Sequence, residues 1–564
     1  MPAAGRRAPR LPQVTSVSHE HPHAPASDRP DLLAALAVDL TALDYTVGAV
    51  AELLGPAAHE ALSRDQTVPA LLATRAAADG GDPARAALAA VVRFFLLARP
   101  LGRAALDAAL PALGAEGLLR LRLAEEADDA GLLAAAADLR PYEWDGAAGA
   151  TRMWVASDLA AHQRPGVLRT DHVLGIGQAS ATLVQATARR PVARALDLGT
   201  GCGIQAFHLL EHAGHVVATD VSERALAFAR FNLLLNAGAL GIDPDRPEER
   251  FELRRGSLLE PVAGERFDLV VSNPPFVITP RARDEQAEDQ FTYRDGGLPG
   301  DELVAGLVAG VGAVLAEGGT AQMLANWEIP EGSPWDERVR GWVPEGLDAW
   351  VLEREEASPE QYAETWLADA SQQRDPGAYE AAYAAYLDDF ASRGTTGIGF
   401  GMVWLRRPGP GQARLGRFEA LTHPLEQPIG PHWAAAVERA DWLAARGAVE
   451  PGPGRGAAIA GERLVVADDV TEERHQRPGA EHPGVILVRQ GAGFRRTSLL
   501  STELAGFVSA CDGDLTAGQI AAALAGLLGR DDDGFRDRLL DEAATLILEG
   551  FLLPATPAEP EEKA

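Results

Sequence analysis

The chain has 564 residues, of which 46% are hydrophobic, and its formal net charge is -30 at pH 7. This length predicts roughly two to four domains with packed cores, and the acidity argues against RNA or DNA as a partner because an acidic surface repels a polyphosphate. Cys202 and Cys511 are its only cysteines, too few for a disulfide framework or a cysteine-ligated metal site, so we expect a reducing compartment such as the cytoplasm and no bound metal.

The first part of the chain reads as a tail followed by a helical domain. Residues 1–30 mix Arg, Pro, Ser and His without an apolar core, which predicts a disordered tail and neither a signal peptide nor a membrane span. Residues 31–150 repeat apolar positions every three or four residues between breaks of Gly, Pro or Asp, as short helices do. We expect helices over 32–43, 47–54, 68–78, 83–99, 103–110 and 118–127.

A short apolar strand then runs into a glycine-rich turn over residues 195–203, Ala-Leu-Asp-Leu-Gly-Thr-Gly-Cys-Gly. Glycines let a backbone approach a ligand closely and turn into a helix, here one that begins near Ile204. The pattern is not G-x-G-x-x-G and no phosphate-binding Lys follows, which argues against a pyrophosphate ligand. It favours a cofactor held by an amino-acid moiety and a ribose.

Two further strands follow the glycine turn. The first, residues 215–220, ends in Asp220 about twenty residues after the glycines, where a carboxylate can accept both hydroxyls of a ribose. Ser222 is expected to cap a helix that runs to about Asn236. A third strand over 251–256 leads to Ser257.

The hydrophobic strand over residues 267–272 ends in Asn273-Pro274-Pro275-Phe276, called here the Asn-Pro-Pro-Phe motif. Two prolines can simply end a strand, but this motif follows the glycine turn by about seventy residues, as expected within one nucleotide-binding sheet. The Asn273 side-chain oxygen and the Pro274 carbonyl can each accept an N–H of a planar nitrogen while the Phe276 ring stacks on it. Such a site activates a poor nitrogen nucleophile without a metal or a strong base.

The sheet pattern continues with alternating helices and strands. We expect a helix over 301–316, a strand over 320–326, a helix over 335–343 and strands over 349–353 and 397–405. The result is an α/β fold with a seven-stranded Rossmann-like sheet over residues 151–407, helices on both faces and the ligand at the carboxyl ends of the strands.

An insertion over residues 356–396 exceeds what a minimal sheet needs. It carries aromatic residues at helical spacing: Tyr362, Trp366, Tyr379, Tyr383 and Tyr386. That spacing places them on one face of a helix, which favours packing against the sheet over a mobile lid above the target.

Beyond the sheet we expect a connector over 408–431, a smaller module over 432–556 and a tail over 557–564. The module's pattern predicts a hairpin over 485–489 and 494–497, helices over 502–511, 518–528 and 534–549, and a last strand over 551–553. Three helices with strands resemble a winged helix. Residues 519–528 offer almost no base-reading side chain, so DNA binding is disfavoured and docking onto the protein or a partner is preferred.

The glycine turn, Asp220 and the Asn-Pro-Pro-Phe motif together resemble the class I S-adenosylmethionine-dependent methyltransferases over about residues 165–407, and the motif narrows this to the branch that methylates amines and amides. Residues 273–280, followed by Tyr293-Arg-Asp-Gly-Gly-Leu-Pro-Gly300, are most similar to the HemK-type release-factor glutamine methyltransferases. Residues 171–180 are similar both to that group and to the ribosomal RNA guanine-N2 methyltransferases.

The resemblance implies S-adenosylmethionine as the cofactor and assigns site residues by position. The implied cofactor contacts are Asp197, Gly199, Thr200, Gly201 and Gly203 around the methionine part, Asp220 on the ribose, Ser257 at the usually acidic adenine position, and Asn273. The implied catalytic residues are Asn273, Pro274, Pro275 and Phe276.

The leading hypothesis is therefore an N-methyltransferase for a planar nitrogen, with a glutamine of a protein substrate ahead of a ribosomal RNA guanine. By analogy, the helical N-terminal domain would grip the protein substrate. A non-catalytic S-adenosylmethionine-binding scaffold is a second hypothesis, against which the intact Asn-Pro-Pro-Phe motif argues. A transcription regulator acting through the C-terminal module is the third.

Overall fold

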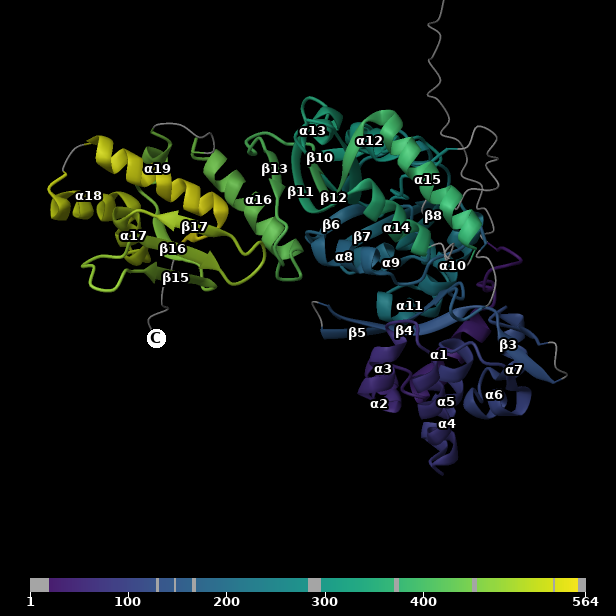
Figure 1. Cartoon of the computed structure of the whole chain (residues 1–564). Helices are drawn as coiled ribbons and strands as arrows, with labels where there is room; N and C mark the ends of the chain where they lie inside the picture. The colour runs from purple at the N-terminus through teal and green to yellow at the C-terminus, as the bar shows by residue number, and fades with distance from the viewer. Residues whose placement is uncertain are drawn as a thin grey trace, which may run out of the picture. The chain divides into compact units, whose positions relative to one another are not determined.

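The computed structural model describes residues 20–127, 131–146, 149–164, 169–281, 296–369, 375–448, 454–530 and 533–555 (Figure 1). The chain divides into two compact units, which are described separately. Unit 1 takes the described residues of Met1–Gly166 together with Gly201–Gly203 and Ser222–Pro244. Unit 2 takes those of Val167–Thr200, Ile204–Val221 and Asp245–Ala564.

Unit 2 is built on an eight-stranded, mostly parallel sheet with the order β13-β11-β12-β10-β9-β6-β7-β8. Its strands are β6 (Val192–Leu198), β7 (Ala213–Asp220), β8 (Phe251–Arg255), β9 (Phe267–Ser272), β10 (Leu315–Pro330), β11 (Asp348–Ala357), β12 (Thr395–Arg406) and β13 (Gly416–Ala420). Only β12 runs antiparallel to its neighbours. The α/β fold and all seven predicted strands are confirmed.

The eighth strand, β13, corrects the prediction of a connector over residues 408–431. It pairs in parallel with β11, in register from Ala349 opposite Gly416 to Glu353 opposite Ala420. Its sequence, Gly-Arg-Phe-Glu-Ala, has too few apolar residues to indicate a strand, because an edge strand needs only one pairing side and little burial.

The helices that follow the first strands begin close to their predicted positions. They are α9 (Ile204–Leu210), α12 (Glu302–Gly310) and α13 (Glu337–Trp342). A further helix, α8 (Gln178–Ala186), precedes β6 and was not predicted. α12 is shorter than predicted because Leu315 already pairs with Phe267 of β9. β10 is longer than predicted, since its last residues pair with β12 beyond the end of β9.

Alternate glycines on one face of β12 make room for a tryptophan of β10. The Trp327 side chain is fully buried. A Cβ atom on Gly399 would lie 2.3 Å from Trp327 Nε1, and one on Gly401 would lie 2.8 Å from the same ring. The indole therefore packs flat against a strand surface that only glycine leaves open.

Gly401→Ala is expected to destabilise unit 2 by about 2 kcal/mol or more, because the new methyl group would lie 2.0 Å from the backbone oxygen of Leu352 and the strand has to shift. The control is Gly416→Ala on β13, where the added Cβ meets no atom within 4 Å. Chemical denaturation of both variants checks this, and equal midpoints would contradict it.

The insertion forms two helices, α14 (Pro359–Asp369) and α15 (Pro376–Arg393), rather than one. Tyr362, Leu367, Tyr386 and Phe390 are buried together with Ile398 of β12, and Trp366, Tyr379 and Tyr383 are partly buried against them. Packing of the aromatic face against the sheet is thus confirmed. Both helices lie beside β12 (Figure 1).

The rest of unit 2 is a smaller C-terminal module with more elements than its sequence predicts. It contains α16 (Gly430–Ala444), β14 (Arg463–Val466), β15 (Val470–His475), β16 (Val485–Gln490), β17 (Thr497–Leu500), α17 (Thr502–Ser509), β18 (Asp512–Thr516), α18 (Ala517–Leu528), α19 (Asp533–Glu549) and β19 (Leu552–Pro554). The three predicted helices and the last strand are present, and the hairpin's second strand is shifted to β17. Thr516 and Gln519 form a capping box at α18, which fixes its start.

Aromatic and ionic contacts join this module to the edge of the sheet. The Phe494 ring stacks on Trp350 of β11, with centroids 5.4 Å apart, and Trp433 of α16 contacts Trp350 edge-on. Arg496 donates to both carboxylate oxygens of Glu419 in β13, at 2.9 and 2.8 Å. These contacts support docking of the module onto the sheet.

Glu419→Gln is expected to cost about 3 kcal/mol at pH 7. Burial alone would raise the pKa of Glu419, but hydrogen bonds and the charges of Arg496 and Arg417 lower it to about 2. A lowered carboxyl pKa contributes stability above the unfolded value of 4.5, and this contribution is lost as the pH falls toward 2. The free energies of unfolding of wild type and variant, measured in urea, should therefore differ by roughly half as much at pH 3 as at pH 7. Glu473→Gln, at a more exposed ion pair with Arg489, is the control and should change little; a gap between wild type and Glu419→Gln that is the same at both pH values would contradict the prediction.

Unit 1 contains strands as well as the expected helices. Its helices are α1 (Pro30–Ala42), α2 (Val47–Leu54), α3 (Pro56–Leu62), α4 (Val68–Asp79), α5 (Pro83–Phe95), α6 (Arg103–Ala109), α7 (Gly114–Arg120), α10 (Glu223–Leu235) and α11 (Ala237–Leu240). Its strands are β1 (Leu101–Gly102), β2 (Ala124–Glu126), β3 (Leu132–Ala135), β4 (Asp138–Gly146) and β5 (Gly149–Ser157). The prediction of an all-helical domain over 31–150, including a helix over 118–127, is wrong after Arg120. The Leu- and Ala-rich segment of β3 has helical propensity, but pairing with β1 and β2 overrides it.

The predicted disordered tail is also wrong over residues 20–29. Ala24 and Ala26 are buried, and Ala26 donates its backbone N–H to Leu121 O at 2.9 Å. Glu20 accepts from Ser27 Oγ at 2.7 Å and from Arg122 Nη2 at 2.6 Å. Residues 1–19 and the predicted tail over 557–564 lie outside the described residues.

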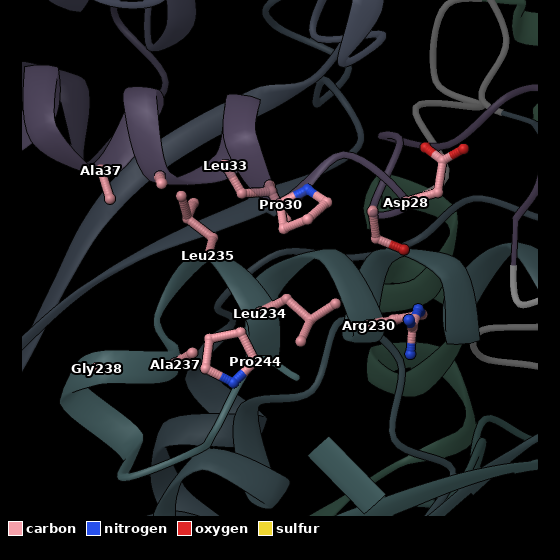
Figure 2. Close-up of a pocket in the computed structure, with 12 residues that line it drawn as sticks. Asp28, Pro30, Leu33, Ala37, Arg230, Leu234, Leu235, Ala237, Gly238 and Pro244 are labelled. Carbon is pink, nitrogen blue, oxygen red and sulfur yellow. The ribbon is translucent and has the colours of Figure 1, made fainter. Parts of the chain in front are cut away.

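Two further features of unit 1 are an open pocket and a bent helix pair. The pocket has a volume of about 330 Å³ and is lined mainly by apolar side chains of α1 and α10, with Asp28 and Arg230 at one end (Figure 2). Across the described ranges, no single helix is long and apolar enough to cross a membrane; α1 and α2, bent by 51°, pass that test of length and composition only as a pair.

Candidate functional site

The parallel strands of unit 2 bring the predicted site residues to one edge of the sheet. β6, β7, β8 and β9 are neighbours and run in the same direction. Asp220 ends β7, Ser257 follows β8 and Asn273 follows β9. Because carboxyl ends of parallel strands meet at one edge, these three residues and the turn after β6 share it.

Backbone hydrogen bonds fix the strand ends against one another. Gly199 and Thr200 both donate their N–H groups to Thr219 O at 2.9 Å. Ser272 Oγ donates to Leu198 O at 2.8 Å. The turn after β6 is thereby held to both neighbouring strands.

The glycines of the turn adopt conformations that other residues rarely adopt. The φ angles are 76° at Gly199, 55° at Gly201 and 98° at Gly203. A Cβ atom on Gly199 would meet only the carbonyl oxygen of Asn273, 4.0 Å away. The space next to the Gly199 Cα atom is therefore open, which leaves room for a ligand.

In unit 1, the carbonyl of Cys202 in this turn accepts a hydrogen bond from Asn232 Nδ2 of α10 at 2.9 Å. The same amide group donates to Ala156 O at 2.8 Å and accepts from Ala156 N. Asn232 thus connects the glycine turn with β5.

Asp197 is fully buried at the end of β6. Its Oδ2 accepts from Thr200 Oγ1 at 2.6 Å and from the backbone N–H of Ala206 at 3.0 Å. Its Oδ1 has no partner among the described residues. Burial raises the pKa of Asp197 to about 7, against the lowering effect of these hydrogen bonds, and the nearby charge of Asp220 adds to the rise.

Asn273 presents a second buried oxygen that lacks a partner within the described ranges. Its side-chain oxygen Oδ1 is inaccessible to solvent. Pro274 is buried, Pro275 and Phe276 are half-buried, and the Phe276 ring meets Trp366 edge-on with centroids 6.4 Å apart. Buried polar atoms are usually paired, so an unpaired acceptor at a strand end is typical of a ligand site.

The other predicted cofactor contacts, Asp220 and Ser257, are less enclosed by the protein than Asp197. Asp220 is half-buried and Ser257 is exposed, and the backbone N–H of Gly256, just before Ser257, donates to Asp220 O at 3.0 Å. Tyr293, Arg294 and Asp295 of the Tyr-Arg-Asp-Gly-Gly-Leu-Pro-Gly segment lie outside the described residues.

Sequence patterns missed one connection to the site. The backbone N–H of Ile278, two residues after Phe276, donates to the Tyr362 hydroxyl at 2.8 Å. The aromatic spacing of the insertion indicated a packed face but not its partner, which lies 84 residues away in the chain.

Two family models match the chain. Residues 158–293 match the Methyltransferase small domain, and residues 42–136 match a domain of unknown function, DUF7059.

Curated relatives are similar to the central part of the chain. The chain is 32% identical over 182 residues to the ribosomal protein uL3 glutamine methyltransferase of Bradyrhizobium diazoefficiens, covering 29% of this chain and 52% of the relative. It is 35% identical over 147 residues to the release factor glutamine methyltransferase of Agrobacterium fabrum, covering 24% of this chain and 46% of the relative. The chain thus spans about half the length of these relatives.

Solved structures resemble the chain weakly. A ribosomal protein L11 methylase from Lactobacillus delbrueckii subsp. bulgaricus is 22% identical with a TM-score of 0.19, over 27% of this chain and 61% of that one. A SAM-dependent methyltransferase from Thiobacillus denitrificans, in complex with S-adenosyl-L-homocysteine, is 18% identical with a TM-score of 0.22, over 41% of this chain and 91% of that one. The central part of this chain, which carries the Asn-Pro-Pro-Phe motif at the end of β9, thus matches the Methyltransferase small domain and is similar to curated glutamine methyltransferases.

Proposed function

We propose that this chain transfers a methyl group from S-adenosylmethionine to the side-chain nitrogen of a glutamine in a protein. The observation that carries this proposal is the Oδ1 atom of Asn273, which is buried and has no hydrogen-bond partner among the described residues, at the end of β9, the strand next to β6. The curated relatives, which are named for methylation of glutamine in a release factor or in ribosomal protein uL3, support the choice of acceptor.

The residues at the sheet edge fit the cofactor. Asp197 offers a free carboxylate oxygen and Gly199 leaves space that a Cβ atom would fill. In this proposal the methionine part is held by Asp197, Gly199, Thr200, Gly201, Gly203 and Asn273, the ribose by Asp220 and the adenine by Ser257. The bound cofactor supplies a methyl group on a positively charged sulfur.

The Asn-Pro-Pro-Phe motif would hold the acceptor. An amide nitrogen is a poor nucleophile because its lone pair is delocalised into the carbonyl group. The Asn273 Oδ1 atom and the Pro274 carbonyl each accept one N–H, and the Phe276 ring fixes the tilt of the flat amide. Pro275 cannot donate to a strand and so keeps the segment out of the ladder. The nitrogen's proton leaves after attack, through Asn273 or to water, so positioning and electrostatics perform the catalysis.

The flanking domains would recruit the protein substrate and stabilise the methyltransferase domain. We propose a substrate-gripping domain over residues 31–150, the methyltransferase domain over 151–407 and a winged-helix-like module over 432–556 that docks on the sheet. The net charge of -30 favours a protein acceptor over RNA. α18 is almost free of base-reading side chains, which argues against DNA. Both cysteines are buried thiols, and we place the protein in the cytoplasm.

The test is transfer of a tritiated methyl group into a cell lysate, followed by digestion with protease or ribonuclease. We expect protease to release the label, and acid hydrolysis of the labelled protein to give methylamine from the modified amide. Release by ribonuclease would instead assign an RNA acceptor. Calorimetric binding of S-adenosylmethionine without any labelled acceptor would favour a non-catalytic scaffold.

A further inference from the structure

A single buried hydroxyl joins the insertion, β10 and the segment after the Asn-Pro-Pro-Phe motif. The Tyr362 side chain of α14 is fully buried. Its hydroxyl oxygen accepts from the backbone N–H of Ile278 at 2.8 Å and from Asn326 Nδ2 of β10 at 2.7 Å. Both donors are buried, so each depends on this oxygen for its hydrogen bond.

The Tyr362 ring is itself held on two sides. It stacks on Phe400 of β12, with centroids 5.6 Å apart and planes at 27°, and meets Phe390 of α15 edge-on at 5.5 Å. Burial raises the pKa of Tyr362 above its ordinary value, so the hydroxyl stays neutral. A rigid ring and a neutral oxygen give the Ile278 amide one fixed anchor.

The same helix also contacts the motif directly. Trp366 lies one turn after Tyr362 on α14, and its ring meets the Phe276 ring at an interplanar angle of 72°. The motif is therefore bound to the sheet through β9 on one side and to α14 on the other.

We propose that Tyr362 is a positioning residue, which fixes Asn273 and Phe276 in the geometry that activates the acceptor nitrogen by holding the Ile278 amide. The inference rests on the proposed function. Two prolines remove backbone donors from the motif, so the chain beyond Phe276 needs an external anchor. Displacement of such a site by about 1 Å costs on the order of 100-fold in rate. The insertion is then a fixed part of the acceptor site.

The test compares Tyr362→Phe with Tyr45→Phe. Tyr45 is a matched control, because it is also buried and its hydroxyl donates to a backbone oxygen, Leu139 O, at 2.7 Å, within unit 1. Both variants keep the ring; Tyr45→Phe loses one buried hydrogen bond and Tyr362→Phe loses two, so both should lose stability, and Tyr362→Phe should lose more. Only Tyr362→Phe is expected to lower kcat, by about 10- to 100-fold, with the Kd for S-adenosylmethionine within about twofold of wild type.

Hydrogen–deuterium exchange gives a readout that needs no activity. Tyr362→Phe should speed exchange in peptides covering residues 276–281 at least about tenfold, and Tyr45→Phe should leave them unchanged. Unchanged exchange in these peptides, or a wild-type kcat in a variant that has lost their protection, would overturn the inference. A wild type that binds the cofactor and labels no acceptor would overturn the proposed function instead, and exchange would still decide whether Tyr362 holds the segment.

Discussion

Asn273→Ala is expected to lower kcat by about 10²- to 10³-fold and to raise the Kd for S-adenosylmethionine by no more than about threefold, because the other residues assigned to its methionine part remain. The variant loses the buried Oδ1, which has no protein partner in the described structure and is free for the acceptor's N–H. Loss of one preorganised hydrogen-bonding group at a reacting centre has an effect of this size. Single-turnover methyl transfer and calorimetry measure the two quantities separately.

Ser272→Ala provides the neighbouring control. Ser272 donates its hydroxyl to Leu198 O at 2.8 Å and supports the same strand end without offering an acceptor to the substrate. We expect it to lower stability modestly and to retain most of the turnover. If both variants lost turnover equally, the effect of Asn273 would be structural; if Asn273→Ala kept wild-type turnover, the assigned role would be wrong.

The sheet was predictable because its central strands are buried on both faces. β6, β7 and β9 read as short apolar runs, and parallel strands need just such sequences. β13 escaped prediction because it is an edge strand with alternating charged residues, Arg417 and Glu419; Arg417 donates to Glu419, and Glu419 also accepts from Arg496, 77 residues away in the chain. Local pattern carries no information on those partners.

The N-terminal residues show the same limit in another form. The segment around Glu20 has the polar composition of a disordered tail, yet it is fixed by an ion pair to Arg122 and by burial of Ala24 and Ala26. Small alanines are compatible with either outcome, because burial of a methyl group contributes little by itself. The contact with a residue about one hundred positions away decides the structure.

The candidate site likewise contains residues that the sequence predicts and a contact that it does not. Asp197 and Asn273 were predicted because each stands at the end of an apolar strand and belongs to a motif with a chemical reason for its residues. Tyr362 was recognised only as part of an aromatic face. Its hydrogen bond to Ile278 depends on how α14 packs over β12, which helical spacing does not determine.

Asp197→Asn is expected to weaken S-adenosylmethionine binding and to remove its pH dependence. The pKa of Asp197 is about 7 because burial disfavours the carboxylate. The α-amino group of the cofactor is cationic below its own pKa of about 8 and pairs with the ionised form alone. Affinity of the wild type should therefore be full near pH 7.5 and fall about tenfold per unit as the pH drops below 7. Calorimetric titrations between pH 5.5 and 7.5 would show this slope in the wild type and a flat, weaker response in the variant.

The stability of the same variant separates an effect on binding from an effect on folding, because Asp197→Asn should weaken cofactor binding without lowering the free energy of unfolding. A carboxyl group whose pKa is raised on folding contributes most below its unfolded value of 3.8, and this contribution is lost as the pH rises through about 7. Asn keeps an oxygen for Thr200 Oγ1 and removes the buried charge, so Asp197→Asn should be at least as stable as wild type at pH 7.5. Weak cofactor binding in a variant that is equally or more stable would assign Asp197 to the cofactor, whereas unfolding of the variant, or wild-type affinity at every pH, would contradict that assignment.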